Sequence, residues 1–201
     1  MINHTTQFDH IFNDVNSFAD TLRDCFKKTT ATDGGYRKEK IYLPKALKES
    51  KSIFKAAHKA GNKVIFIGNG GSAGIASHLA IDYCKNAKIR SIAFNDAAAL
   101  TCMSNDYGYK YVFAKQLEFY GRPGDVVVAI SSSGKSVNII EAAAQAKQSN
   151  MGLITLSGMD SENPLRGAGD INYFVPSDDY GVIEITHLTL LHTITSVIHL
   201  R

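Results

Sequence analysis

The sequence has little cysteine, no long apolar run and little excess charge, and each absence excludes a class of protein. Its three cysteines, Cys25, Cys84 and Cys102, are far apart and include no Cys-x-x-Cys pair. We therefore predict reduced thiols in a cytoplasmic protein, and no disulfide framework. No apolar run approaches the roughly 18 residues of a membrane span, and the polar start MINHTTQFDH is no signal peptide. A net charge of +3 without a basic cluster does not favour a nucleic-acid partner.

What the sequence does contain is typical of one α/β domain. The 201 residues are 44% apolar and 20% charged, which is enough for a full core. Short apolar segments alternate with helical stretches, so we predict a three-layer α/β/α fold with a five-stranded parallel sheet. The predicted strands are 64–67, 90–94, 125–130, 152–156 and 171–175, and the predicted helices after the first strand are 73–84, 97–104, 111–120, 137–148 and 181–199.

The first 60 residues are predicted to form two amphipathic helices. Apolar residues recur at steps of three and four, which indicates one apolar stripe: Phe8, Ile11, Phe12, Val15, Phe18 and Leu22. The stripe fades at a turn-rich segment, residues 29–35, and Pro44 begins the second helix. These helices pack either on their own sheet or against another subunit. We favour a role in oligomerisation, within a single domain that spans residues 1–201.

The central element of the chain is a strand, a glycine-rich turn and a helix at residues 63–85. Gly68, Asn69, Gly70, Gly71 and Ser72 follow the strand directly, and the glycines allow positive φ angles and close approach of a ligand. Ser72 is the predicted N-cap of the helix. Free amide groups at a helix start form an anion site, most often for phosphate. The alternative is a tight turn without a ligand, because the segment matches neither the Walker nor the dinucleotide pattern.

A second polar loop follows the strand at residues 125–130. It reads SSSGKS over residues 131–136 and opens the helix 137–148. Serine hydroxyls can donate to phosphate oxygens, and the helix start supplies amides. In parallel sheets, ligands bind beyond the carboxyl ends of the strands, where both loops are expected. Two such loops favour a bound phosphate over an empty serine-rich loop.

Several motifs together resemble the sugar isomerase (SIS) domain. They are GNGGSA followed by ASH after the first strand, ISSSGKS after the third, and ITLSG in the fourth. SNDYGY at residues 104–109 and EITHLTLLH in the last helix narrow the resemblance to the phosphoheptose isomerase family. Over roughly residues 44–200, this resemblance implies a homotetramer that converts sedoheptulose 7-phosphate to D-glycero-D-manno-heptose 7-phosphate, a precursor of lipopolysaccharide or capsule. It also implies a zinc site between subunits.

The resemblance assigns a role to each matching residue. Substrate contacts fall to the glycine loop (Asn69, Gly70, Gly71 and Ser72), to the pair Asn105 and Asp106, and to the phosphate loop (Ser131, Ser132, Ser133 and Ser136). The metal ligands are His78, Asp82, Glu184 and His192, and Glu184 also borders the substrate. Asp82 and His192 are in addition the catalytic base and the acid/base group. The other helix histidines, His58, His187 and His199, are expected to be satisfied core or interface residues.

The spacing of the ligands supports one metal site. His78 and Asp82 are four residues apart and share one helix face, whereas Glu184 and His192 lie about 12 Å apart along a helix axis. One straight helix cannot easily aim both at a single ion, so we predict that they come from different subunits. Two histidines with two carboxylates suit Zn²⁺, and Mn²⁺, Fe²⁺ and Co²⁺ remain open.

Several residues depart from the family pattern, among them Val182 in place of the family's Arg. Asp82 stands where the family has a Glu, Glu184 where it has a Gln, and Lys135 where it has an Asn. Asp is one methylene shorter, which sets a base back by about 1–1.5 Å, and misplacement on that scale can cost about 100-fold in rate. The inferred reaction is an aldose–ketose isomerisation through a cis-enediol. The alternatives are an isomerase of another sugar phosphate and a non-catalytic phosphosugar-binding or protein-binding SIS protein of the replication-initiator-associating type.

Overall fold

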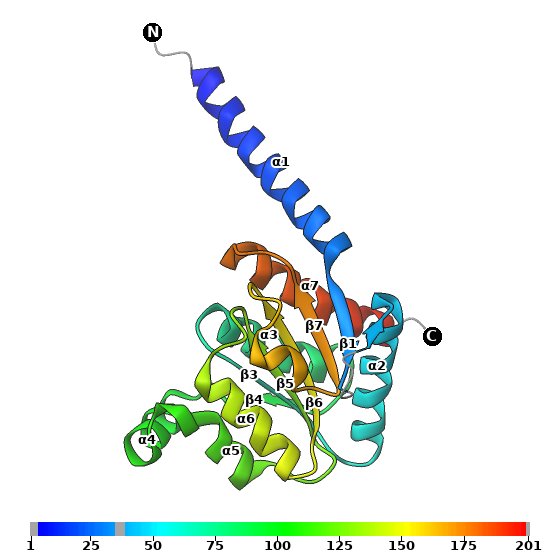
Figure 1. Ribbon diagram of the computed structural model, residues 1–201, viewed down its shortest axis with the longest axis vertical. Helices are drawn as coiled ribbons and strands as arrows, with labels where there is room; N and C mark the ends of the chain where they lie inside the picture. Colours follow the sequence, from blue (N-terminus) through cyan, green and yellow to red (C-terminus); the bar gives the residue numbers. More distant parts are fainter. Residues whose placement is uncertain (1–3, 35–38, 200–201) are drawn as a thin grey trace.

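The computed structural model describes residues 4–34 and 39–199, and the side chains of residues 14–34 and 39–196. A seven-stranded sheet forms its centre, in the order β2-β1-β7-β6-β5-β3-β4 (Figure 1). The strands are β1 (Thr30–Asp33), β2 (Lys40–Ile41), β3 (Val64–Gly68), β4 (Ser91–Ala93), β5 (Val126–Ser131), β6 (Gly152–Gly158) and β7 (Ile171–Val175). The five strands β3 to β7 pair in parallel, which confirms the predicted fold class.

The predicted number of strands was wrong by two. Residues 29–35 were expected to be a turn-rich break, but residues 30–33 form β1, which pairs antiparallel with β7 and with β2. Residues 1–60 are therefore not helical throughout. Ala31 is fully buried in β1, yet its neighbours are polar, so the segment has no apolar alternation. The open edge of β7 recruits this strand by backbone pairing, which sequence pattern does not reveal.

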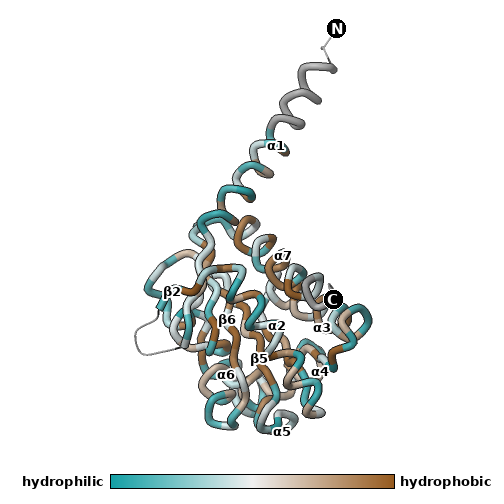
Figure 2. The backbone as a smooth tube through the Cα atoms, turned by 90° about the vertical axis from the view of Figure 1, so that its right-hand side faces the viewer, coloured by the Kyte–Doolittle hydropathy of each residue, from teal (hydrophilic) through white to brown (hydrophobic). Residues whose placement is uncertain are grey.

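Helices cover both faces of the sheet. The helical elements are α1 (His4–Lys28), α2 (Leu43–Lys59), α3 (Gly71–Lys85), α4 (Ala97–Tyr107), η1 (Tyr109–Tyr111), α5 (Val112–Tyr120), α6 (Val137–Gln148), η2 (Pro164–Gly167) and α7 (Tyr180–His199). Strand side chains alternate between the faces: Val64 and Phe66 pack in the core with α2, α3 and α7. Ile65 and Ile67 pack in the core with α5 and α6. Strands β5 and β6 are largely brown, and so apolar, in Figure 2.

Helix α1 projects away from the rest of the molecule (Figures 1 and 2). Its residues 14–20 are exposed, including Val15 at 62% and Phe18 at 39% of their full area. The earlier part of the predicted stripe, Phe8, Ile11 and Phe12, lies outside the residues whose side chains are described. The described apolar side of α1 is therefore largely uncovered within one chain.

Of the described helices, none is both long enough and apolar enough to cross a membrane.

His187 is a buried histidine in α7, as predicted for this residue. Its Nε2 donates to the backbone oxygen of Ser157 at 3.2 Å, and its Nδ1 has no partner within the described residues. Burial lowers the pKa of His187 to about 4 from the ordinary 6.5, because the charged form has lost its water. His58 instead is exposed on α2 and accepts from the Arg90 amide at 3.3 Å, and the side chain of His199 lies outside the described residues.

This buried histidine is expected to make the protein less stable in acid. The folded-state pKa lies below the unfolded value, so the unfolded chain binds a proton that the folded chain does not, and stability is lost as pH falls from about 6.5 toward 4. Between pH 7.5 and pH 5 we expect a loss on the order of 2 kcal/mol from His187 alone. Urea unfolding at the two pH values measures it. His187→Gln should flatten this part of the pH dependence, whereas His58→Gln should leave it; equal slopes for native protein and His187→Gln would refute the assignment.

Candidate active site

The glycine and serine loops meet in one pocket. Strands β3 and β5 are parallel neighbours in which Gly68 is opposite Ile130, so the loops that follow them leave the same edge of the sheet. They enclose a pocket of about 250 Å³. Its lining is Asn69, Gly70, Gly71, Ser72, Ile130, Ser131, Ser132, Ser133, Ser136, Tyr180 and Glu184. The structure thus brings together both loops that the sequence singled out.

The serine loop is shaped to receive an anion. The hydroxyl of Ser131 donates to Ser136 Oγ at 3.2 Å, while the hydroxyl of Ser132 is buried without a partner among the described residues. Ser136 is the N-cap residue of α6 but makes no side-chain capping bond, so the first amides of α6 have no capping oxygen from it. An unpaired buried hydroxyl beside a helix start is a favourable position for a phosphate oxygen.

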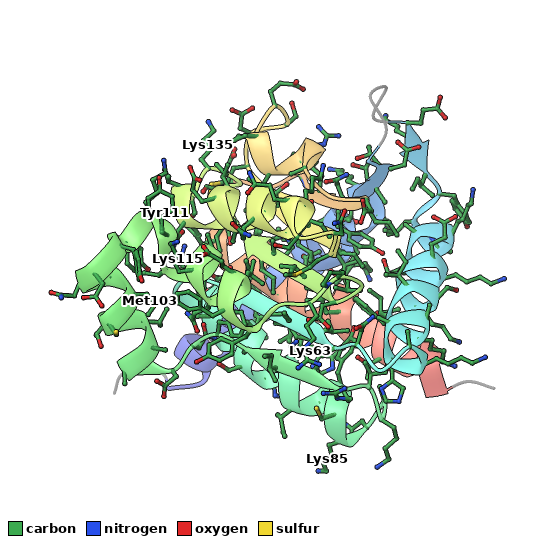
Figure 3. All side chains as sticks on the ribbon, turned by 90° about the horizontal axis from the view of Figure 1, so that it is seen from below. Lys63, Lys85, Met103, Tyr111, Lys115 and Lys135 are labelled. Atoms are coloured by element: carbon green, nitrogen blue, oxygen red, sulfur yellow. The ribbon has the colours of Figure 1, made fainter. Side chains whose placement is uncertain are left out.

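The serine loop contacts the segment that follows β6. Gly134 has a φ of +63°, and a Cβ there would overlap the side chain of Asn163. The amide of Leu165 donates to the Gly134 oxygen at 3.2 Å. Lys135 extends to the same segment, where its ammonium pairs with Asp160 at 2.8 Å (Figure 3). That hydrogen bond lowers the pKa of the Asp160 carboxyl. The Lys135 charge is therefore neutralised outside the pocket lining.

Helix α3 begins at Gly71, two residues earlier than it would with Ser72 as its cap. Gly70, with a φ of +54°, is the N-cap residue, and Ser72 lies inside the first turn with 3% of its area exposed. The predicted capping role of Ser72 was therefore wrong. Gly68 explains why: a Cβ at this position would lie 2.6 Å from the Ser72 oxygen, so the chain turns more tightly than a serine cap permits.

Glu184 reaches the start of α3 from α7. A Cβ on Gly71 would overlap the Glu184 carboxylate, which shows how closely the side chain packs on the glycine backbone. A carboxylate is favourable at a helix N-terminus because the helix dipole is positive there. Within one chain, Glu184 therefore lies in the pocket between the glycine and serine loops.

A second group of residues, His78, Asp82 and His192, gathers where α3 and α7 pack together. One ligand atom from each lies within 4.8 Å of the others. The two Nε2 atoms are 3.3 Å apart, and Asp82 Oδ2 lies 3.5 Å from His192 Nδ1 and 3.9 Å from His78 Nε2. We call these three residues the His–Asp–His cluster.

The cluster has the donor set of a divalent metal site. Two imidazole nitrogens and one carboxylate oxygen suit Zn²⁺ and leave room for a further ligand. Asn86 donates to Asp82 Oδ1 at 2.9 Å, which leaves Oδ2 directed to the histidines. The cluster borders a second pocket of about 420 Å³, lined also by Lys85 and Lys88.

Comparison with known proteins identifies the family. Residues 40–158 match the model of the SIS domain. A phosphoheptose isomerase of Yersinia pestis (strain Pestoides F) is 36% identical in an alignment of 196 residues that covers 94% of this chain and 95% of that relative. The chain belongs to the phosphoheptose isomerase family. A second member, from Campylobacter jejuni, is 40% identical over 146 residues, 70% of this chain and 78% of its own.

Solved structures of phosphoheptose isomerases share the fold. The structure from Neisseria gonorrhoeae has a TM-score of 0.79 at 28% identity and covers 95% of this chain and 98% of its own. The structure from Francisella tularensis has a TM-score of 0.79 at 27% identity, with 94% and 98% covered. The resemblance drawn from the sequence motifs is thereby confirmed.

Not every residue matched to the phosphoheptose isomerase pattern lies at one place. Asn105 and Asp106 are on α4, outside the pocket lining, where the Asn105 amide donates to Asp106 Oδ1 at 2.9 Å. Glu184 lies in the pocket, whereas the other three predicted ligands form the His–Asp–His cluster. One chain of this family member therefore presents the pocket between the two loops and, apart from it, the His–Asp–His cluster.

Sequence reasoning missed the residues that support these sites. Asn163 and Asn138 are buried, with 1% and 3% of their area exposed, and each makes side-chain hydrogen bonds next to a loop of the pocket. Asn86 orients Asp82, and Tyr180 lines the pocket. The only signal in the sequence was a polar residue near each motif, which many exposed positions share.

Proposed function

We propose that this protein is an aldose–ketose isomerase that interconverts sedoheptulose 7-phosphate and D-glycero-D-manno-heptose 7-phosphate. The observation that carries the proposal is that a member of the phosphoheptose isomerase family keeps both a pocket for an anion and the His–Asp–His cluster. A phosphate handle fixes the orientation of the sugar, and an acid/base group moves the protons.

The proposed chemistry moves one proton between C1 and C2 of the sugar through a cis-enediol. The Asp82 carboxylate accepts the proton from the carbon next to the carbonyl and returns it to the neighbouring carbon. His192 carries the accompanying proton between the two oxygens. The serine hydroxyls and the α6 amides hold the phosphate. The unpartnered Ser132 hydroxyl and the missing side-chain cap of Ser136 support this role. Only protons and the double bond move, so no external oxidant or reductant is needed.

A divalent cation, Zn²⁺ by the donor set, is proposed for the His–Asp–His cluster. His78, Asp82 and His192 would hold it, with Glu184 of a neighbouring subunit as a further ligand. When bound, such an ion polarises the substrate carbonyl and stabilises negative charge on its oxygen.

We further propose a cytoplasmic homotetramer that makes precursors of surface polysaccharides. Glu184 and His192 are about 12 Å apart along α7, so one chain does not direct both to one ion. The exposed apolar side chains of α1 favour an interface between subunits. The three free thiols suit a reducing compartment. Light scattering that finds a fully active monomer would contradict the shared site.

The direct test is a substrate panel. Purified protein with measured zinc content is incubated with ketose phosphates of five, six and seven carbons, and formation of the aldose is followed. We expect turnover of the seven-carbon ketose to exceed the others by at least about ten-fold in kcat/KM, since even a single carbon unit in a fitted site changes the free energy by about 1–3 kcal/mol. Turnover of a shorter ketose would reassign the substrate, and binding of all without turnover would favour a phosphosugar-binding protein.

A further inference from the structure

One side chain of the pocket, Asn69, has almost all of its hydrogen-bonding capacity used within the protein. Its Nδ2 donates to Asn138 Oδ1 at 2.9 Å, and its Oδ1 accepts from Asn138 Nδ2 at 2.9 Å. The Oδ1 also accepts from the hydroxyl of Tyr109 at 3.0 Å. A primary amide has two N–H donors and two lone pairs, so one N–H donor remains for a ligand.

These bonds connect three parts of the site. Asn69 belongs to the glycine loop, and Asn138 is buried at the start of α6, two residues after the serine loop ends. Tyr109 begins η1, which packs against α6. The next residue, Lys110, pairs with Glu141 of α6 at 2.9 Å. The reciprocal amide pair thus sets the distance between the two loops, and Tyr109 attaches η1 to both.

Helix α4 and η1, which Tyr109 connects to Asn69, have few buried residues of their own. Helix α4, all of whose residues are described, contains none that is fully buried. Its Leu100 and Met103 are only partly buried against the core. Because α4 leads directly into η1, its position relative to the pocket depends strongly on the bonds made by Tyr109 and Lys110.

We propose that Tyr109 and Asn138 are positioning residues that orient Asn69 as a hydrogen-bond donor toward the bound sugar phosphate. They act through Asn69 and do not touch the substrate themselves. Asn69 then contacts an oxygen lone pair of the ligand, phosphoryl or hydroxyl, rather than a hydroxyl hydrogen. This inference deepens the proposed isomerase function and rests on it for the identity of the ligand.

Removing the Tyr109 hydroxyl tests the inference with little risk to folding, because this residue is 58% exposed. We expect Tyr109→Phe to raise KM for sedoheptulose 7-phosphate about five-fold, as for the loss of one hydrogen bond, with kcat changed less than about two-fold. The matched control is Tyr107→Phe, in the same segment, whose hydroxyl makes no hydrogen bond to any described residue; its kinetics should equal those of the native protein.

A second variant replaces the hydrogen-bond donor that Asn138 offers to Asn69 with an acceptor. Asn138→Asp places an acceptor opposite the Asn69 Oδ1, so Asn69 loses its fixed orientation and KM should rise about ten-fold or more. The double variant Tyr109→Phe/Asn138→Asp should show less than the product of the two effects, because both act through Asn69. Thermal unfolding separates this from a structural role: we expect an unchanged Tm for Tyr109→Phe.

Calorimetric titration with inorganic phosphate makes the outcome independent of catalysis. If the native protein binds phosphate but isomerises no sugar, the proposed function fails, and the phosphate affinities still decide the inference. It is supported if Tyr109→Phe binds phosphate about five-fold more weakly than Tyr107→Phe does. It is overturned if the two variants have the same KM and the same phosphate affinity, if Tyr109→Phe lowers only the Tm, or if the native protein binds no phosphate.

Discussion

Replacing Asp82 by asparagine is expected to lower kcat by about 10³-fold. Asn keeps the size of the side chain but cannot accept a proton, and a positioned general base contributes about 10²–10⁴-fold. It also removes the only anionic ligand of the His–Asp–His cluster, so the zinc content of the purified protein should fall in parallel. Initial rates with sedoheptulose 7-phosphate and metal analysis of the same samples measure both effects.

The complementary variant, Asp82→Glu, should raise the rate of the native protein. The longer side chain returns the carboxylate to the reach of the family's glutamate, and a shift of about 1 Å can change the rate by up to about 100-fold. Asp20→Asn, an exposed residue of α1 that pairs with Arg23, is the control and should leave the rate unchanged. If Asp82→Asn retains more than about a tenth of native activity, Asp82 is not the base.

Removing two serine hydroxyls of the phosphate loop is expected to raise KM about 100-fold. In Ser133→Ala/Ser136→Ala, two donors to a charged phosphate are lost, and a hydrogen bond to a charged group contributes about 1.5–3 kcal/mol. Both residues are only partly buried, so the Tm should change little. Steady-state kinetics and thermal unfolding of the double variant measure the two quantities.

The matched control for the loop is Ser52→Ala, on the exposed side of α2, where the hydroxyl donates to the Lys48 oxygen at 3.0 Å. It should change neither KM nor Tm. Unchanged kinetics in the double variant would refute the assignment of phosphate binding to this loop. A Tm lowered by more than a few degrees would instead indicate that the hydroxyls hold the fold, as the bond between Ser131 and Ser136 does locally.

The parallel half of the fold was predictable because its cause lies in the sequence itself. Strands buried on both faces must be short continuous apolar runs, and VIFIG of β3 and VVVAI of β5 read that way. Strand β1 could not be predicted, because Thr30–Asp33 owes its conformation to backbone bonds with β7. Its mainly polar residues show no alternation of apolar and polar positions. The start of α3 was misplaced for a related reason: Ser72 is a good cap in isolation, but the tight approach of Gly68 moves the cap to Gly70.

The sequence by itself determined the two loops, their order and the i, i+4 pair of His78 and Asp82, because these depend on residue type and local spacing alone. Only the tertiary structure decided which of the remaining polar residues meet. Packing of α3 on α7 brings His192 to Asp82 at 3.5 Å and places Glu184 against Gly71 instead. The arrangement of α6 and η1 beside the glycine loop also joins Asn69 to Asn138, 69 residues later, and to Tyr109. Contacts between distant segments follow from how the elements pack in space, and no local sequence pattern indicates which distant residues will come into contact.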